Sequence, residues 1–157
     1  MLNVDLYTER YNRRGSLDVH GIPNFVRADA SSLPFKEIAF ESVIASHVLE
    51  HVKYPFETLK EWKRVASRRV IVTVPSLSSA VFMHKECEYH LHSWSKSSLE
   101  SFMRLVFQRI TVSFNPRPMK WYWKGTIPTI VNFIIHNFLS YLAVFQNAEL
   151  IAIGTIE

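Results

Sequence analysis

The chain has a single cysteine, Cys87, among its 157 residues. One cysteine excludes an intrachain disulfide and fits a reducing compartment, so we expect a cytoplasmic location. The N-terminus turns polar within a few residues of Met1, and we therefore expect no secretory signal peptide. The formal net charge of +4 is modest and does not by itself indicate nucleic acid as a partner.

The sequence also lacks internal repeats and low-complexity tracts, while 48% of its residues are hydrophobic. This is enough apolar material for one domain with a core, and too short a chain for two ordinary domains. We therefore predict a single domain over residues 1–157.

A strand, helix and second strand are predicted over residues 39–75. Residues 42–45 form a β-branched apolar run, which gives way to the polar residues Ser46 and His47. Pro55 then suits the first turn of a helix, whose apolar residues recur at helical spacing. Residues 69–74 are a second buried strand. Such βαβ units build a parallel sheet, and the carboxyl ends of its strands are where ligands bind.

The wider pattern of the chain predicts further elements around this unit. Strands are expected near residues 2–6, 24–29, 107–114 and 148–155. A helix follows Ser95 or Ser97, either of which can cap it, and Glu100 would complete a capping box with Ser97. Together these elements predict an α/β fold.

Five short stretches, taken in order, resemble the class I S-adenosylmethionine-dependent methyltransferases of the small-molecule type. They are Asn24-Phe-Val-Arg-Ala-Asp-Ala30, Leu33-Pro-Phe35, Phe40-Glu-Ser-Val43, Val48-Leu-Glu-His51 and Glu61-Trp-Lys-Arg-Val65. The resemblance implies a Rossmann-like, mainly parallel sheet with an antiparallel C-terminal strand at residues 148–155. It also implies S-adenosylmethionine as cofactor and a small-molecule methyl acceptor.

The resemblance further implies which residues hold the cofactor. Asp5, with Leu6 beside it, would end the second strand of the family and bind the ribose hydroxyls, since a carboxylate accepts from both arms of a diol. Asp29 would accept from the adenine amino group and Ala30 would supply a backbone donor. Ser46, at the next strand end, completes the predicted cofactor-binding set.

One feature of the family is missing from this sequence, namely the Gly-rich loop after the first strand. Met1 stands where the second strand should begin, so we expect an N-terminally truncated version of the fold. The alternative to a methyltransferase is a non-catalytic or incomplete subunit that needs a partner chain or serves as a scaffold. In the family the missing strand lies between the strand ending at Asp5 and the strand at residues 42–46. Either these two strands pair with each other, or a strand from another chain enters between them, because buried backbone groups must be paired. We expect a homo-oligomer, or a second chain that supplies the missing strand.

His47 is the first candidate for a catalytic base, because an imidazole titrates near neutral pH. A helix-capping or substrate-orienting role fits it as well. His84, His90 and His92, followed by Trp94, would by resemblance lie in a loop that closes over the substrate. Together with Cys87 these histidines also suggest zinc. Their spacing matches no ligand motif, so no metal is predicted.

The last distinctive segment, residues 119–146, is predicted to be an apolar helical insertion before the final strand. Residues 127–145 carry no formal charge and approach the length of a membrane span, but a narrow polar stripe runs along the helix. A partner interface, a peripheral membrane contact and a buried core helix all remain open. The segment favours an apolar methyl acceptor.

Overall fold

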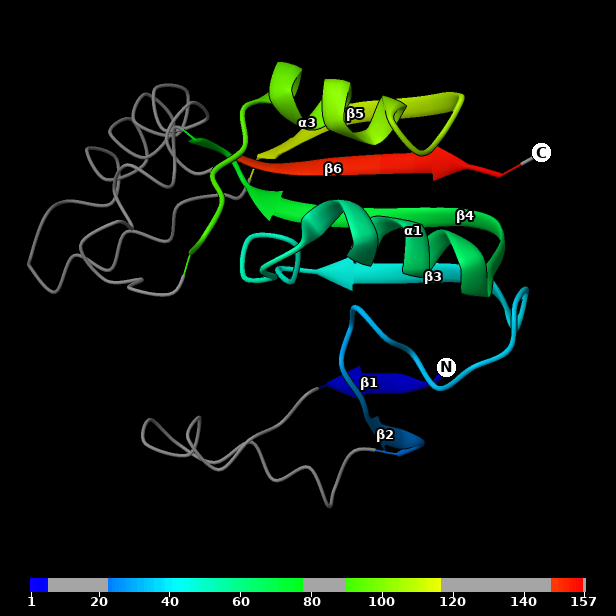
Figure 1. The fold of residues 1–157 in the computed structure, drawn as a ribbon. Helices are drawn as coiled ribbons and strands as arrows, with labels where there is room; N and C mark the ends of the chain where they lie inside the picture. The colour runs from blue at the N-terminus through cyan, green and yellow to red at the C-terminus, as the bar shows by residue number, and fades with distance from the viewer. Residues whose placement is uncertain (6–22, 78–89, 117–147, 157) are drawn as a thin grey trace, which may run out of the picture.

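The computed structural model of the protein describes residues 1–5, 23–77, 90–116 and 148–156 (Figure 1). The helices of this part are α1 (Pro55–Val65) and α3 (Lys96–Arg104). Its strands are β1 (Asn3–Asp5), β2 (Phe25–Arg27), β3 (Phe40–Ser46), β4 (Ala66–Pro75), β5 (Arg109–Pro116) and β6 (Ala148–Thr155). Every strand that the sequence predicts is therefore present, with ends that shift by no more than three residues.

The strands form two sheets rather than one. β1 and β2 pair in parallel as a two-stranded sheet, and the other four strands follow the order β3-β4-β6-β5. β3 and β4 are parallel, whereas β6 is antiparallel to both of its neighbours. The predicted antiparallel C-terminal strand is thus confirmed. Since only β6 is reversed within the larger sheet, its other three strands point the same way.

Both helices lie on one face of the larger sheet (Figure 1). α1 begins at Pro55 and buries Leu59, Trp62 and Val65 against the sheet. The face that meets the helices carries alternate residues of β4, namely Val70, Val72 and Val74, all fully buried. This is the period of two expected of a strand that presents one face to a helical layer.

The start of α3 differs in detail from the prediction. Ser95 is the N-cap, and its hydroxyl accepts from the Ser98 N–H at 3.1 Å while the Ser98 hydroxyl lies 2.9 Å from the Ser95 N–H. The capping box therefore pairs Ser95 with Ser98, and the predicted pairing of Ser97 with Glu100 is wrong. Glu100 instead accepts from Arg104 one turn later, at 2.9 Å.

The opposite face of the larger sheet carries a row of isoleucines. Ile44 of β3 lies beside Ile71 of β4, which lies beside Ile153 of β6. Ile44 remains 64% exposed, although it stands in the middle of a strand. Among the described elements no helix covers this row, because α1 and α3 lie on the other face (Figure 1).

β6 has a tight contact at Gly154 that explains why a glycine stands in this strand. A Cβ atom built at Gly154 would lie 2.4 Å from the ring of Phe107, which is itself buried. The aromatic ring therefore occupies the space that any other side chain would need, and it seals the connection between α3 and β5 onto the sheet.

One edge of β1 and one edge of β3, between which the first strand of the family would lie, have no paired strand in the described part of the chain. The sequence left two outcomes: β1 moves to pair with β3, or another strand enters between them. Within the described residues, β1 pairs only with β2 and β3 only with β4. The first of the two outcomes is therefore wrong.

The predicted helical insertion at residues 119–146 lies outside the described residues. In the described ranges, no helix combines the length and the apolar character that crossing a membrane requires.

Candidate functional site

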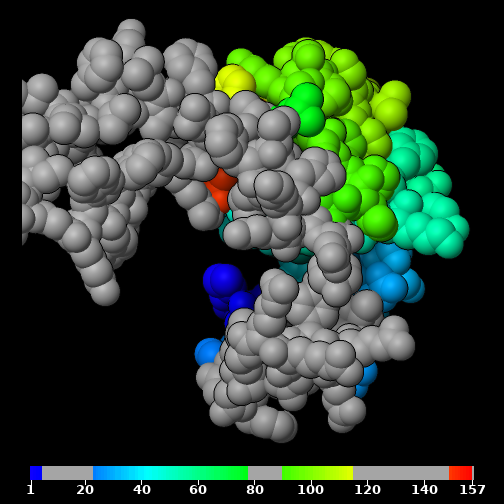
Figure 2. Space-filling model, turned by 90° about the vertical axis from the view of Figure 1, so that its left-hand side faces the viewer, coloured from blue at the N-terminus to red at the C-terminus, as the bar shows by residue number. Residues whose placement is uncertain are grey.

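Three strand ends meet at one edge of the larger sheet. Ser46, the last residue of β3, lies beside Thr73 of β4, and the backbone N–H of His47 donates to the Thr73 carbonyl at 3.0 Å. Because β6 runs antiparallel, its beginning lies beside the end of β4, so that Glu149 pairs with Pro75. Figure 2 looks onto this edge, where the start of β6 (red) and the N-terminal strand (blue) both reach the surface.

His47 stands at the centre of this edge with both ring nitrogens against carboxylates. Nδ1 lies 3.2 Å from Glu50 Oε1, and Nε2 lies 2.5 Å from Glu149 Oε1. The backbone of His47 has a φ of 54°, in the left-handed region that non-glycine residues seldom adopt. A strained backbone that aims a titratable side chain is a frequent feature of functional sites.

The two carboxylates that hold His47 are both buried. The side chain of Glu50 is 1% exposed and that of Glu149 is 11% exposed, while the imidazole is 35% exposed. A buried carboxylate needs a positive or hydrogen-bonding partner, because desolvation of an unpaired charge is costly. A neutral imidazole has one N–H, so His47 can donate to one of the two carboxylates while its other nitrogen remains able to accept a proton.

Glu50 also fixes the segment that leads into α3. Its backbone carbonyl accepts from the N–H groups of Leu91 and His92, at 2.8 and 3.2 Å. His92 Nε2 lies 3.0 Å from the carbonyl of Val52, and the ring of His90 lies 4.7 Å from that of His51. Residues 90–92 therefore lie directly against the turn that follows β3, as a loop beside the site should.

Trp94 is the last of the predicted substrate residues. Its side chain is 8% exposed and belongs to the core, with its ring 4.8 Å from that of Phe102. Its contribution is to anchor the loop, since Leu77 N–H donates to its backbone carbonyl at 2.6 Å.

Asp29, the predicted adenine ligand, organises the turn after β2. Its Oδ1 accepts from the backbone N–H and the hydroxyl of Ser31, at 2.8 and 2.6 Å. These two hydrogen bonds, that of the side chain first, lower the pKa of Asp29 below its ordinary value, so the carboxylate stays ionised. In the described part of the chain Oδ2 makes no hydrogen bond, and the residue is exposed.

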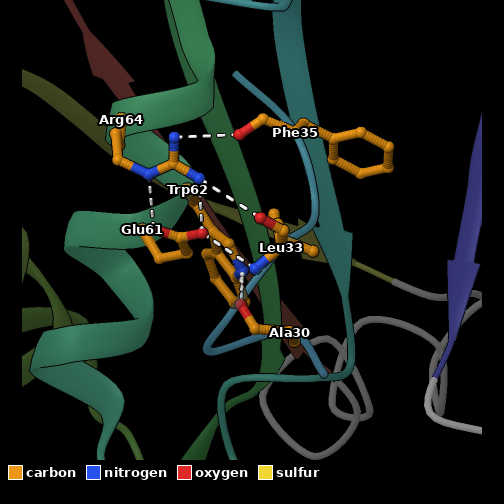
Figure 3. Close-up of polar contacts among 6 residues, drawn as sticks. All are labelled: Ala30, Leu33, Phe35, Glu61, Trp62 and Arg64. Carbon is orange, nitrogen blue, oxygen red and sulfur yellow. Dashed lines mark hydrogen bonds and ion pairs between the residues drawn. The ribbon is translucent and has the colours of Figure 1, made fainter. Parts of the chain in front are cut away.

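The loop after this turn is fastened to α1 by two charged residues (Figure 3). Glu61 Oε1 accepts from the Leu33 N–H at 2.8 Å, and Arg64 donates to the carbonyls of Phe35 and Leu33 at 2.9 and 3.3 Å. Glu61 and Arg64 also form an ion pair at 2.7 Å. Leu33-Pro34-Phe35 is therefore tethered to α1.

Trp62 completes this attachment from the same helix. Its Nε1 donates to the carbonyl of Ala30 at 3.0 Å, while its ring is 2% exposed (Figure 3). The Ala30 carbonyl is thus occupied, whereas its N–H makes none of the described hydrogen bonds, as the predicted role of backbone donor requires.

Replacing Glu61 with glutamine should destabilise the protein at neutral pH more than in acid. The hydrogen bond from Arg64 is the main cause that lowers the pKa of Glu61, and the Leu33 N–H adds to it against the opposing effect of burial. A carboxylate with a lowered folded-state pKa stabilises the fold above its unfolded pKa, near 4.3, and this stabilisation is lost as the pH falls through the folded pKa. Urea unfolding at pH 7 and pH 3 measures the difference.

The matched control for that experiment is Glu57→Gln, an exposed carboxylate in the first turn of the same helix. In the described part of the chain Glu57 has no hydrogen bond or ion pair. Its replacement should change the free energy of unfolding little at either pH. An equal loss for Glu61→Gln at both pH values would contradict the assignment.

Of the remaining predicted site residues, the structure describes some fully, one by its backbone alone, and others not at all. Asp5 ends β1 as expected, although only its backbone is described. Ser46 is exposed and its hydroxyl accepts from Thr73 Oγ1 at 3.0 Å. Leu6 and His84 lie outside the described residues. A hollow between α1 and the connection from α3 to β5 lies at the far end of the sheet, beside Ser67, and is separate from this edge.

Glu149 is the site residue that sequence reasoning missed. The signal was present, because Glu149 is the only charged residue in an otherwise apolar strand, Ala148–Thr155. Its meaning depends on the antiparallel register, which places it 102 positions away from His47 in sequence and in direct contact in space.

Comparison with known proteins defines the class of this fold. Residues 2–73 match the family described as a methyltransferase domain. A S-adenosylmethionine-dependent methyltransferase from Archaeoglobus fulgidus has a similar structure, with a TM-score of 0.62 and 18% identity, over 99% of this chain and 75% of that one. The protein therefore has the fold of the class I S-adenosylmethionine-dependent methyltransferases.

Two further structures show the same fold. A Thermotoga maritima methyltransferase, described as a possible histamine N-methyltransferase, gives a TM-score of 0.60 at 17% identity, over 85% of this chain and 64% of that one. A Mesorhizobium loti methyltransferase gives a TM-score of 0.60 at 10% identity, over 99% of this chain and 80% of that one. The chain thus spans less than two thirds of the Thermotoga protein. Curated protein sequences give no significant match.

Proposed function

We propose that the protein transfers the methyl group of S-adenosylmethionine to a small, apolar acceptor at the edge where β3, β4 and β6 meet. The observation that carries this proposal is the arrangement around His47, a partly exposed imidazole held by two buried carboxylates at the carboxyl end of a parallel strand. Ligands of open α/β sheets bind at such ends.

Asp5 and Asp29 are the proposed contacts to the cofactor. Asp29 fits the adenine amino group because its exposed carboxylate keeps one oxygen outside the turn, and the N–H of Ala30 is placed next to it. Asp5 would accept from the ribose hydroxyls at the end of β1, one strand away from β2. The cofactor supplies an electrophilic methyl group on a sulfonium.

His47 is the proposed base for an acceptor that must lose a proton. Glu149 holds Nε2 through the shorter of the two contacts and so fixes the orientation of the ring. Nδ1, which lies 3.2 Å from Glu50, is the nitrogen that would receive the proton of the acceptor when this longer contact opens. With the cofactor bound, the acceptor would take its methyl group, and His47 would keep the proton that the acceptor loses.

His84, His90 and His92 are the proposed substrate-side residues. Support for this comes from residues 90–92, which lie against the turn after β3 through the Glu50 carbonyl. The preference for an apolar acceptor rests on the composition of residues 119–146, and a peripheral membrane contact of that segment stays a prediction.

The partner that we propose is a β-strand between β1 and β3, provided by a second chain or by a second copy of this one. The open edges of these strands in the described part of the chain support it. Backbone N–H and C=O groups at such edges pair readily with an added strand.

Binding of S-adenosylmethionine to Asp29→Asn tests the cofactor assignment. Asparagine keeps one oxygen for Ser31 but replaces the other with an NH₂ group, which cannot accept from an adenine amino group. Affinity should fall by about 10- to 100-fold, equivalent to about 1.5–3 kcal/mol for a hydrogen bond to a charged group. Isothermal titration calorimetry measures it.

The matched control is Glu41→Gln, an exposed carboxylate whose partner is Arg68 at the far end of β3. Its affinity for the cofactor should equal that of the wild type. Unchanged affinity in Asp29→Asn would remove Asp29 from the site, and a wild-type protein that binds no cofactor even after its sheet is completed would contradict the proposed function.

A further inference from the structure

A second group of potential ligands shares Glu50 with His47. Glu50, His51 and His90 each direct one oxygen or nitrogen to a common region, and these atoms all lie within 4.8 Å of one another. Glu50 and His51 come from the turn after β3, whereas His90 comes from the segment that leads into α3. The cluster therefore joins two parts of the chain that are 39 positions apart.

Glu50 supplies the strongest indication that this cluster binds something. Its Oε1 is engaged by His47, but its Oε2 is buried and has no hydrogen-bond partner among the described residues. Native structures seldom leave an oxygen of a buried carboxylate without a water or an ion, because its desolvation is not compensated. The orphaned oxygen belongs to the same residue that the two histidines surround.

The backbone already holds the cluster in position. The Glu50 carbonyl accepts from the N–H groups of Leu91 and His92, which brings the residue after His90 into contact with Glu50. The rings of His51 and His90 lie 4.7 Å apart at an angle of 61°. Both histidines are half-buried, whereas Glu50 is buried.

We propose that Glu50, His51 and His90 form a binding site for a zinc ion, with Glu50 Oε2 and one nitrogen from each histidine as ligands. Two imidazoles and one carboxylate are a ligand set suited to zinc, whereas magnesium and calcium prefer oxygen ligands alone. Three protein ligands leave a fourth position for water. Zinc bonds of 2.0–2.1 Å in tetrahedral geometry place the ligand atoms about 3.3–3.4 Å apart, so atoms that lie up to 4.8 Å apart would have to approach one another by up to about 1.5 Å.

The ion would clamp residues 90–92 against the turn after β3. It would also share Glu50 with the proposed base, since one carboxylate oxygen would bind the metal and the other would remain on His47. His47 is then an outer-shell partner of the metal, and such partners commonly change metal affinity by about 10- to 100-fold. This site does not depend on the proposed methyl transfer.

The site differs from the set of His84, Cys87, His90 and His92 that the sequence suggested. His92 Nε2 is occupied by the Val52 carbonyl and lies outside the cluster. Only His90 belongs to both sets, and the two assignments can therefore be separated by substitution.

The test is a zinc titration of the full chain, freed of metal by a chelator, with isothermal titration calorimetry and a Co²⁺ absorption spectrum as readouts. We expect one zinc ion per chain, and a Co²⁺ spectrum typical of four-coordinate geometry. His51→Ala and His90→Ala should each weaken zinc binding at least tenfold. Both residues are half-buried, and a circular dichroism spectrum like that of the wild type verifies that each variant folds.

The controls are His92→Ala and Cys87→Ser, which should retain the wild-type zinc affinity within a factor of two or so. Failure of the wild type to bind zinc at micromolar concentration would overturn the proposal. Weaker binding in the two controls, with unchanged binding in His51→Ala, would overturn it as well and would favour the set suggested by the sequence.

Discussion

Addition of a β-strand, a Gly-rich turn and a helix before Met1 should raise the affinity for S-adenosylmethionine at least tenfold and stabilise the fold. The grafted unit would be the first strand, loop and helix of a structural neighbour such as the Archaeoglobus fulgidus methyltransferase. A helix is needed in the graft, because two parallel strands require a crossover connection of a dozen residues or more.

Two independent observations support this expectation. The first is the pair of open edges, since in the described part of the chain β1 pairs only with β2 and β3 only with β4. The second is the isoleucine row on the face away from α1 and α3, where Ile44 is 64% exposed. Sheets with parallel strands are normally covered on both faces. Covering Ile44 alone would contribute about 1–2 kcal/mol.

The gain in cofactor affinity has a separate cause. Backbone N–H groups in a Gly-rich turn can approach the cofactor closely, since glycine has no Cβ and the following helix places its N-terminus there. The graft would restore these donors next to Asp5. Calorimetry gives the affinity, and urea unfolding gives the stability.

The control graft carries two prolines in its strand, at positions whose N–H groups would enter the ladder. Proline cannot donate these hydrogen bonds, so this graft should fail to insert. Light scattering adds a second readout, because the chain without a graft should form a dimer or larger assembly and the grafted chain should be a monomer. If both grafts gave the same cofactor affinity, stability and oligomeric state, the proposed place for a strand between β1 and β3 would be contradicted.

The local pattern of the sequence predicted most of the fold, because each strand is a compact apolar run and α1 has a clear start at Pro55. Contacts between residues of two different elements were harder to predict. Glu61-Trp62 looked like a family signature with no stated role, and its role is to attach residues 30–35 to the helix. Trp62 donates to the carbonyl of Ala30, which is 32 positions away. Such a hydrogen bond cannot be predicted from the hydrophobic periodicity of the sequence.

From the sequence, only the site residues that directly follow β3 could be predicted. His47 and Glu50 follow directly from the polar residues after residue 45. Glu149 and His90 join them through sheet register and loop placement, which are properties of the tertiary structure. The capping box shows the same limit on a smaller scale, since Ser95 and Ser97 are equally good caps in the sequence and packing of the chain selects Ser95.

Replacement of His47 with alanine should cause the largest loss of both stability and activity among single substitutions at the site. The change would leave Glu50 and Glu149 facing each other, both largely buried, without the group that lies between them. Loss of the partner of a buried polar group costs about 1–3 kcal/mol, more for a charged group, so we expect a loss of about 2–3 kcal/mol at pH 7. Methyl transfer should fall by about 10²- to 10⁴-fold if His47 is the base.

A double variant separates these two effects. Addition of Glu149→Gln should restore stability at pH 7, since it removes one of the two charges, but should not restore methyl transfer. Urea unfolding and a methyl-transfer assay with radiolabelled S-adenosylmethionine measure the two properties.

A His47→Ala protein with wild-type stability at pH 7 would show that the contacts to Glu50 and Glu149 contribute nothing. Recovery of activity in the double variant would show that His47 acts on stability alone.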